Sequence, residues 1–317
     1  MDTSLVEVKN LKKYFKTPNG LLHAVDNISF SLKKGQTLGV VGESGCGKST
    51  LGRTILRLIE PTEGEVLFKG ESILGYDFHQ MREIRKQMQI IFQDPYSSIN
   101  PRMTVSDIIA EPVRVCKTIT GEENIQKAVN EIMERVGLSN RLVNSYPHEL
   151  DGGRRQRIGV ARAIILNPEF IVCDEPVSAL DVSIQAQILN LMMDLQEENG
   201  YSYMFITHDL SVVKHISDEI MVMYMGQCVE KAKKNDLFDH PNHPYTKALL
   251  DAILIPDISE KKKRSNLIKG EVTSPVNPKP GCRFAPRCPY ATEACTAGHV
   301  PLKEISPEHY VACTLFQ

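Results

Sequence analysis

Apolar and polar positions along this chain follow two patterns, one typical of strands and one of helices. Val6–Val8 and Ile28–Leu32 alternate as half-buried strands do. Short continuous apolar runs, typical of fully buried strands, occupy Thr37–Val41, Ile90–Phe92, Phe170–Cys173, Tyr203–Ile206 and Ile220–Tyr224. Apolar residues recur at helical spacing over Ser49–Ile59, Glu122–Val136 and Ile184–Glu197. Strands that alternate with helices predict an α/β fold with a largely parallel sheet.

The amino-acid composition of the sequence changes near residue 256. Beyond this point Lys261–Arg264 is a run of four basic residues, and prolines and glycines follow as far as Gly281. We therefore predict one large domain over residues 1–256 and a small C-terminal extension over residues 257–317.

Composition and charge exclude several classes of protein. The net charge of −2 argues against a nucleic-acid binder held by bulk charge, so we expect no nucleic-acid partner. No apolar run approaches the roughly 18–20 residues of a membrane span. The first residues, Met1–Ser4, lack the basic and then apolar pattern of a signal peptide. We expect the protein to stay in the cytoplasm and to reach a membrane only through a partner.

A glycine-rich turn follows the run Thr37–Val41. Its residues, Gly42-Glu43-Ser44-Gly45-Cys46-Gly47-Lys48-Ser49, match the phosphate-loop pattern G-x-x-x-x-G-K-[ST]. Glycines let successive N–H groups converge on phosphate oxygens, and the following helix adds its positive N-terminal end. A turn that matches by chance is the alternative. The flanking strand and helix instead favour binding of ATP and Mg²⁺ through Gly42, Ser44, Gly45, Cys46, Gly47, Lys48, Ser49 and Thr50.

Two acids, Asp174 and Glu175, end the apolar run that begins at Phe170. Such a pair often only begins a turn or a helix. Beside a phosphate loop, however, the first acid can bind Mg²⁺ and the second can act as general base toward water. Gln93 and His208 each follow another strand. The order of these residues along one chain favours a nucleotide-hydrolysing site.

With these motifs the chain resembles the ATPase subunits of ABC transporters over about residues 5–255. The resemblance implies a RecA-like core with an antiparallel β subdomain and a helical subdomain at about residues 95–165. It also implies roles for single residues. By this resemblance Lys48 binds phosphate, and Ser49, Gln93 and Asp174 bind Mg²⁺. Glu175 is the catalytic base, with Gln93 and His208 as further catalytic residues. Asp181 is the acid of the D-loop, and Tyr14 stacks on adenine or is a core aromatic.

One motif departs from the family. The family signature L-S-G-G-Q caps the γ-phosphate of ATP on the opposite subunit, whereas this chain reads Leu150-Asp151-Gly152-Gly153-Arg154. Gly152 and Gly153 can still offer N–H groups, and Asp151 can still cap a helix. An ionised aspartate cannot donate to phosphate as serine does. We therefore expect an asymmetric heterodimer with one slow site; the alternative is a tolerated or engineered change without asymmetry.

Several stretches resemble the peptide and nickel importer branch, closest to the F-type ATPase subunit. They are Val41–Lys48, Phe92–Pro95, Ser98–Val105 and His243–Leu250. This resemblance implies a second ATPase subunit, two membrane permease subunits, an external or periplasmic peptide-binding protein as an indirect partner, and a peripheral position on the cytoplasmic face of the membrane. The alternatives are a regulatory subunit with little hydrolysis of its own and a soluble ABC protein acting on ribosomes or DNA.

Four of the eight cysteines crowd the C-terminal extension. Cys282, Cys288, Cys295 and Cys313 form a C-x5-C-x6-C-x17-C series. Disulfides are disfavoured in a reducing cytoplasm, and zinc prefers tight C-x2–4-C pairs that are absent here. An iron–sulfur cluster tolerates looser spacing, and the resemblance to importer ATPases also implies a 4Fe–4S cluster. Zinc and free thiols are the alternatives.

Overall fold

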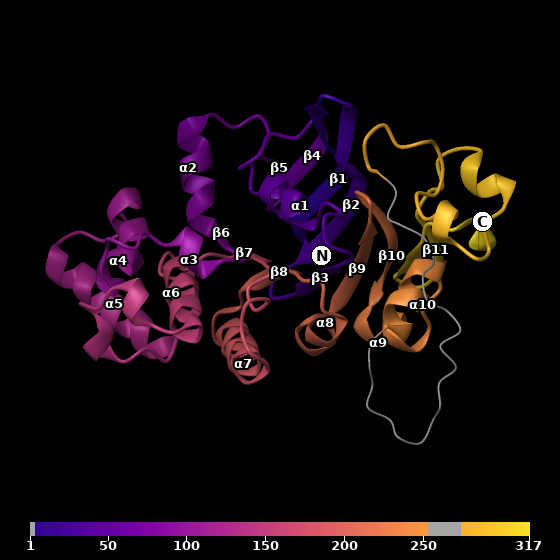
Figure 1. The fold of residues 1–317 in the computed structure, drawn as a ribbon. Helices are drawn as coiled ribbons and strands as arrows, with labels where there is room; N and C mark the ends of the chain where they lie inside the picture. The colour runs from indigo at the N-terminus through magenta and orange to yellow at the C-terminus, as the bar shows by residue number, and fades with distance from the viewer. Residues whose placement is uncertain (1–3, 253–273) are drawn as a thin grey trace, which may run out of the picture. The chain divides into compact units, whose positions relative to one another are not determined.

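The computed structural model describes residues 4–252 and 274–317 (Figure 1). These residues divide into two compact units. The first unit contains residues 4–6, 31–37 and 67–206, and the second contains residues 7–30, 38–66, 207–252 and 274–317. The predicted boundary near residue 256 and the basic run Lys261–Arg264 lie outside the described residues.

Helices account for most of the first unit, and they pack through apolar residues at helical spacing. In α5, for example, Ile125, Val129, Ile132 and Met133 are buried. Helix α4 contacts α5 and α6, and α6 also contacts α3 and α7, in the magenta and salmon part of Figure 1. These helices are α2 (Phe78–Gln87), α3 (Pro95–Ser98), α4 (Val105–Cys116), α5 (Glu122–Arg135), α6 (Gly152–Ile164) and α7 (Val182–Asn199), with 3-10 turns at Asn140–Leu142 and Pro147–Glu149.

Three parallel strands carry the acidic pair of the first unit. Strand β7 (Phe170–Asp174) pairs in parallel with β6 (Met88–Ile91) and with β8 (Ser202–Ile206). Every residue of β7 and β8 is buried, as the continuous apolar runs predict for strands covered on both faces. A separate short strand, β5 (Glu71–Ser72), pairs with the end of β4 (Glu63–Phe68).

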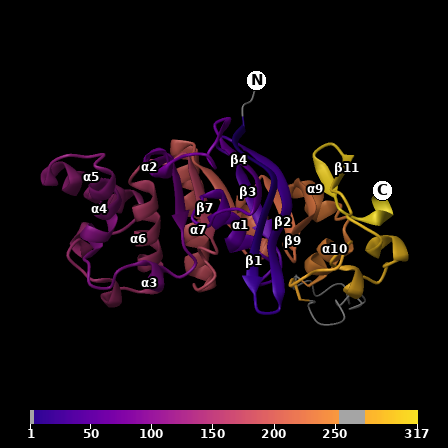
Figure 2. The ribbon, with the colours of Figure 1, turned by 90° about the horizontal axis from the view of Figure 1, so that it is seen from above.

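The second unit contains a long hairpin and a mixed group of strands. Strand β1 (Ser4–Thr17) lies between β2 (Gly20–Lys33) and β4, and Figure 2 shows these long indigo strands side by side. Strand β3 (Thr37–Val41) pairs in parallel with β9 (Glu219–Tyr224), and β9 pairs antiparallel with β10 (Gln227–Lys233). The predicted α/β class is confirmed. Parallel pairing joins β6, β7 and β8 and joins β3 to β9, but the antiparallel β10 makes the strand pairing mixed rather than largely parallel.

The helices of the second unit are short. Helix α1 was predicted to extend to Ile59 but ends at Ile55, because Arg57 adopts a left-handed φ of 50° and the Leu58 amide donates to the Arg53 carbonyl at 2.9 Å. The helices are α1 (Lys48–Ile55), α8 (Leu210–Ile216), α9 (Lys234–Asp239) and α10 (Pro244–Asp251).

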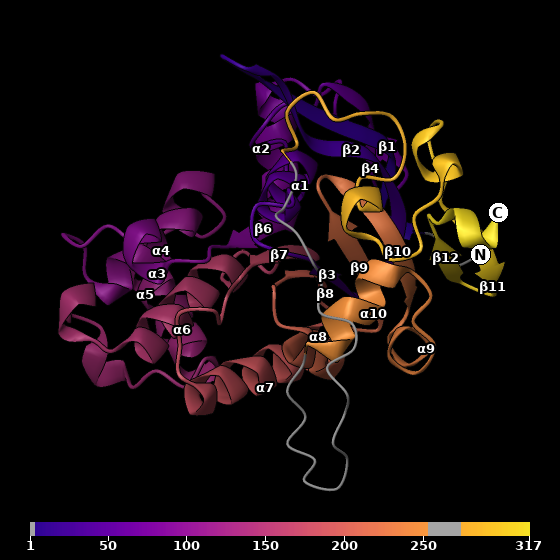
Figure 3. The same ribbon diagram turned by 45° about the vertical axis from the view of Figure 1, so that its right-hand side comes forward.

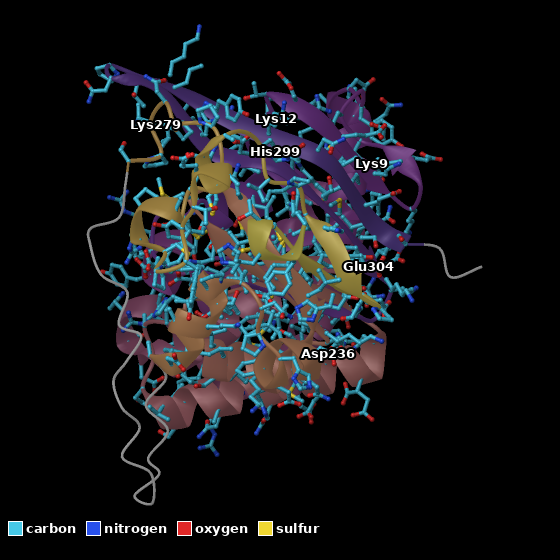
Figure 4. The ribbon with its side chains drawn as sticks, turned by 90° about the vertical axis from the view of Figure 1, so that its right-hand side faces the viewer. Lys9, Lys12, Asp236, Lys279, His299 and Glu304 are labelled. Atoms are coloured by element: carbon cyan, nitrogen blue, oxygen red, sulfur yellow. The ribbon has the colours of Figure 1, made fainter. Side chains whose placement is uncertain are left out.

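The C-terminal segment, residues 274–317, packs onto β10. Strand β12 (His309–Val311) pairs antiparallel with β10 and with β11 (Lys303–Ser306), beside α9 and α10 in Figure 3. Three 3-10 turns complete the segment at Ala285–Arg287, Glu293–Thr296 and Thr314–Phe316. Figure 4 looks onto this segment, with the exposed residues Lys279, His299 and Glu304 labelled.

A buried carboxylate joins this segment to α10. The side chain of Glu230 is fully buried, lies 2.7 Å from Nε2 of His309, and accepts from the amides of Asn242 and His243. His243 in turn caps α10, because its Nδ1 accepts from the Tyr245 amide at 3.1 Å. Burial lowers the pKa of His243 to about 4, and the charge of Glu230 opposes this shift only in part.

We predict that His243 makes stability depend on pH between about 6.5 and 4. In the unfolded chain His243 takes up a proton near pH 6.5, whereas in the folded chain it does so only near pH 4. The contribution of neutral His243 to the free energy of unfolding is therefore fully present above pH 6.5. It is lost as the pH falls to about 4, and the total loss is on the order of 3 kcal/mol.

Urea unfolding of the parent and of His243→Asn at pH 7 and pH 4.5 measures this contribution. Asparagine keeps a cap acceptor but does not titrate, so the variant loses less stability on acidification. His240→Asn, at an exposed position, is the control and behaves as the parent. An unchanged pH dependence in His243→Asn contradicts the assignment.

Candidate functional site

The glycine-rich turn of the second unit connects β3 to α1. Gly42 and Gly47 have φ values of 154° and 90°, in the left-handed range that favours glycine. A Cβ atom on Gly47 would lie 1.8 Å from the carbonyl oxygen of Ala24, and one on Gly42 would lie 2.1 Å from that of Met223. Both positions therefore require glycine, because the loop packs directly against neighbouring backbone.

The side chain of Lys48 lies inside this turn and bonds to its backbone. Its side chain is buried, and Nζ donates to the carbonyl oxygens of Gly42 at 2.9 Å and Glu43 at 3.4 Å. Ser44 and Gly45 are exposed, whereas Cys46 is buried and its carbonyl accepts from the Gly226 amide at 2.7 Å. Backbone N–H groups, a lysine and the start of α1 together form the arrangement that binds a chain of phosphates.

The acidic pair lies at the carboxyl end of β7 in the first unit. Asp174 is buried, and Glu175 has a left-handed φ of 48°, which is uncommon outside glycine. The Glu175 amide donates to the carbonyl of Ile206 at 2.9 Å, which fixes this backbone. The amide Nε2 of Gln93 donates to Oε2 of Glu175 at 3.0 Å. The structure thus brings together two residues that are 82 positions apart and that the sequence assigned to one reaction.

His208 lies at the end of β3 where the phosphate loop begins. The Thr207 amide donates to the carbonyl oxygen of Val40 at 3.1 Å, so the next residue, His208, follows beside the Gly42 end of the strand. The side chain of His208 is exposed, and Asp209 caps α8 by accepting from the Ser211 amide.

Tyr14 is half-buried and belongs to a network that the sequence did not indicate. Its ring stacks on His23 with centroids 3.9 Å apart, and its hydroxyl donates to Asp26 at 2.5 Å. Asp26 also accepts from the guanidinium of Arg283. Burial alone would raise the pKa of Asp26, but the Tyr14 hydroxyl, the Arg283 charge and His23 together lower it. Burial and the bond to Asp26 raise the pKa of Tyr14.

The altered signature begins α6 in the first unit. Asp151 caps the helix by accepting from the Arg154 amide at 2.8 Å, and its carboxylate lies 3.0 Å from a guanidinium nitrogen of Arg154. Gly153 is buried, and a Cβ atom there would lie 2.7 Å from the Ile184 side chain, whereas Gly152 has more room. The two substituted residues of the signature therefore pair with each other, and both glycines remain at the helix start.

Of the four C-terminal cysteines, Cys295 and Cys313 are buried, whereas Cys282 and Cys288 are partly exposed. Burial is the main cause of the raised pKa of Cys282, and the thiols of Cys313 and Cys295 add to it. The sulfur of Cys295 lies 3.2 Å from the hydroxyl of Thr314, and none of the eight cysteines forms a disulfide. Within residues 4–252 and 274–317, no group of three or more histidine, cysteine or acidic side chains is arranged to hold a metal. The predicted 4Fe–4S site of Cys282, Cys288, Cys295 and Cys313 thus has no support in this arrangement.

Magnesium has different requirements. Mg²⁺ prefers oxygen ligands and takes most of them from water and from the phosphates it accompanies. In the first unit Gln93 carries an amide oxygen and Asp174 a buried carboxylate at a strand end, and in the second unit Ser49 carries a hydroxyl. This donor chemistry fits a nucleotide-bound Mg²⁺.

Comparison with known proteins covers nearly the whole chain. A family model described as "ABC transporter" matches residues 25–178, and one described as "Oligopeptide/dipeptide transporter, C-terminal region" matches residues 229–295. The chain is 51% identical to "Oligopeptide transport ATP-binding protein AppF" of Bacillus subtilis, over 99% of this chain and 98% of that protein. It is 50% identical to "Oligopeptide transport ATP-binding protein OppF" of Salmonella typhimurium, over 97% and 92% respectively.

A solved structure supports the fold. The dimeric post-hydrolysis state of the ATP-binding cassette MJ0796, bound to ADP and Pi, matches with a TM-score of 0.67 and 29% identity, covering 72% of this chain and 98% of that one. None of the helices in the described part of this chain has the length and apolar composition needed to cross a membrane. From its sequence, its fold and these relatives, the chain belongs to the ABC transporter family, in the branch of the oligopeptide transport ATP-binding proteins, and it is an ATPase.

Proposed function

We propose that this ATPase energises the uptake of oligopeptides through a membrane transporter. The main support is identity of about 50% to oligopeptide transport ATP-binding proteins over almost the full chain. For hydrolysis itself, the observation that carries the proposal is the hydrogen bond between Gln93 and Glu175 at the carboxyl end of β7.

Each site residue has a role that follows from its chemistry. The amides of Gly42–Ser49 and the ammonium of Lys48 bind the phosphates of ATP, and Tyr14 faces the base. Ser49, Gln93 and Asp174 would hold Mg²⁺, which would neutralise part of the negative charge on the phosphates. Glu175 accepts the proton of the attacking water, Gln93 orients that water through its amide, and His208 donates to the γ-phosphate.

We propose further that the chain works in an asymmetric heterodimer. The support is the signature at the start of α6, where Asp151 replaces the donor serine. A carboxylate ~5 Å from a γ-phosphate costs about 3 kcal/mol at an effective dielectric of ~20. The ion pair with Arg154 offsets part of this cost, although both side chains are more than half exposed and solvent weakens the pair. The partner subunit's phosphate loop would therefore lie under the weaker cap.

The remaining partners follow from the same proposal. Two permease subunits would bind this chain on the cytoplasmic face of the membrane, and a peptide-binding protein would act through them. The stretch of roughly residues 96–113, after Gln93, is the proposed contact for the permeases. The proposed helical subdomain covers about residues 95–165, and residues 257–317 form the proposed extension. A regulatory subunit with little hydrolysis is the second candidate, favoured only by Asp151 and Arg154.

An iron–sulfur cluster in the C-terminal segment also stays a proposal. Its support is the spacing of the four cysteines in the sequence and the resemblance to importer ATPases. Anaerobically purified protein should then contain iron and sulfide and absorb in the visible range. Zinc at one per chain without iron would contradict the cluster.

We predict that Glu175→Gln lowers ATP turnover by at least about 100-fold, the lower bound for loss of a general base, while ATP still binds. The measurements are phosphate release and ATP titration, with the partner subunits present. The exposed Glu197→Gln on α7 serves as the control and keeps parental turnover. Parental turnover in Glu175→Gln would reject this residue as the base.

We predict that Asp151→Ser with Arg154→Gln raises turnover at the site that they cap by about tenfold. This is less than the ~100-fold expected from full relief of ~3 kcal/mol, because Arg154 already offsets part of the repulsion. The test is the ATPase rate of the two-subunit complex. Replacing the phosphate-loop lysine of the partner must abolish the gain. An unchanged rate removes the asymmetry proposal.

A further inference from the structure

An arginine of the C-terminal segment contacts the phosphate loop directly. The guanidinium NH1 of Arg287 donates to both carboxylate oxygens of Glu43, at 3.0 and 3.2 Å, and to the Tyr224 hydroxyl at 3.2 Å. The Arg287 side chain is 9% exposed. Its Nε is buried and has no hydrogen-bond partner within the described residues, so Glu43 and Tyr224 are the contacts that hold the guanidinium.

Glu43 is the second residue of the phosphate loop, and it is fixed from three sides. Its amide donates to the Tyr245 hydroxyl at 3.0 Å, its carbonyl accepts from Lys48 at 3.4 Å, and its carboxylate pairs with Arg287. A carboxylate in a loop that binds phosphates would repel them if it were unpaired. Arg287 cancels this charge and also fixes the start of the loop.

A second arginine of the same segment, Arg283, lies beside the stacked rings of Tyr14 and His23. Arg283 is 5% exposed on its side chain, pairs with Asp26, donates to the Met225 carbonyl, and lies 3.4 Å from Nδ1 of His23. Asp26 accepts from the Tyr14 hydroxyl, so Arg283 orders the carboxylate that orders this ring.

The two arginines flank an apolar anchor. Phe284 is 1% exposed and packs against the rings of Tyr224 and Tyr245, each with its centroid 5.3 Å away. It belongs to the core cluster that also contains Val41, the last residue before the phosphate loop. Because Phe284 is buried in this cluster between the two arginines, it holds their backbone beside the loop.

We propose that Arg283 and Arg287 are positioning residues for ATP, so that the C-terminal segment completes the nucleotide site. Arg287 orders and neutralises the phosphate loop through Glu43, and Arg283 acts through Asp26 to order Tyr14, the residue proposed above to bind the base, and His23, which stacks on it. The proposal rests on the proposed function in one respect, the assignment of Gly42–Ser49 and Tyr14 to ATP.

The role of Arg287 in phosphate binding is tested in the full-length chain with two variants. They are Arg287→Met and the double variant Glu43→Gln, Arg287→Met. Calorimetric titration with Mg·ATP and with Mg·tripolyphosphate, which lacks a base, should show binding of both weakened about tenfold in Arg287→Met. The double variant should recover most of this loss, because no unpaired carboxylate remains. A purely structural role predicts no recovery, so an equal loss in both variants overturns the proposal.

The role of Arg283 in binding the adenine base is tested with Arg283→Met and the same two ligands. Binding of ATP should weaken about tenfold while binding of tripolyphosphate stays parental, because only ATP carries the base. Lys233→Gln removes an exposed ion pair with Glu308 in the same part of the chain and is the matched control with parental binding. Equal weakening of both ligands, or of neither, overturns the role of Arg283.

The parent protein separates this inference from the proposed function. If the parent binds ATP and the arginine variants bind it equally well, only the inference fails. If the parent binds neither ATP nor tripolyphosphate, the proposed nucleotide site itself fails, and the inference fails with it.

Discussion

The structure of the nucleotide site depends on one constraint, the close packing of a glycine turn against neighbouring backbone. Gly47 lies against the carbonyl of Ala24 on β2, and Gly42 lies against that of Met223 on β9. No side chain fits at either position, so the turn holds its N–H groups in place without rearrangement. Lys48 lies under the turn and bonds to its carbonyl oxygens. A turn fixed in advance in this way loses little entropy when it binds phosphate.

The same turn joins the hairpin to the C-terminal segment. The Gly226 amide donates to the Cys46 carbonyl, and the Gly226 carbonyl accepts from the Asp26 amide. Arg283 reaches Asp26 from the C-terminal segment, and Arg287 reaches Glu43. Residues more than 240 positions apart thus share one hydrogen-bonded network around the loop. This network gives the C-terminal segment a physical connection to nucleotide binding that does not require a metal.

Local patterns were enough to predict much of this fold and part of the site. The apolar runs located β3, β7, β8 and β9 within a residue or two, because fully buried strands need uninterrupted apolar sequence. The order of Gly42–Ser49, Gln93 and Glu175 predicted that these residues serve one nucleotide-hydrolysing site, and within the first unit the structure joins Gln93 to Glu175 by a hydrogen bond. The end of α1 was predicted four residues too late, since the left-handed turn at Arg57 leaves no mark in hydrophobic spacing.

The missed parts of the site depend on long-range contacts. Arg283 and Arg287 lie between Cys282 and Cys288, in a stretch whose cysteines indicate metal binding. No local pattern indicates that these arginines pair with Asp26 and Glu43. His23 was missed because a single histidine in a strand is usually structural. The cysteine series was assigned to a cluster from its spacing and from the resemblance to importer ATPases, and neither determines whether four sulfurs converge.

Titration of the full-length chain with Mg·ATP, beside the variant Lys48→Ala, tests the central claim most directly. The fixed glycine turn and its lysine predict clear binding by the parent and a loss of about 10- to 100-fold in the variant, as expected for a charge-assisted bond to phosphate. Equal affinity of the two proteins, or no binding by the parent, would contradict the account.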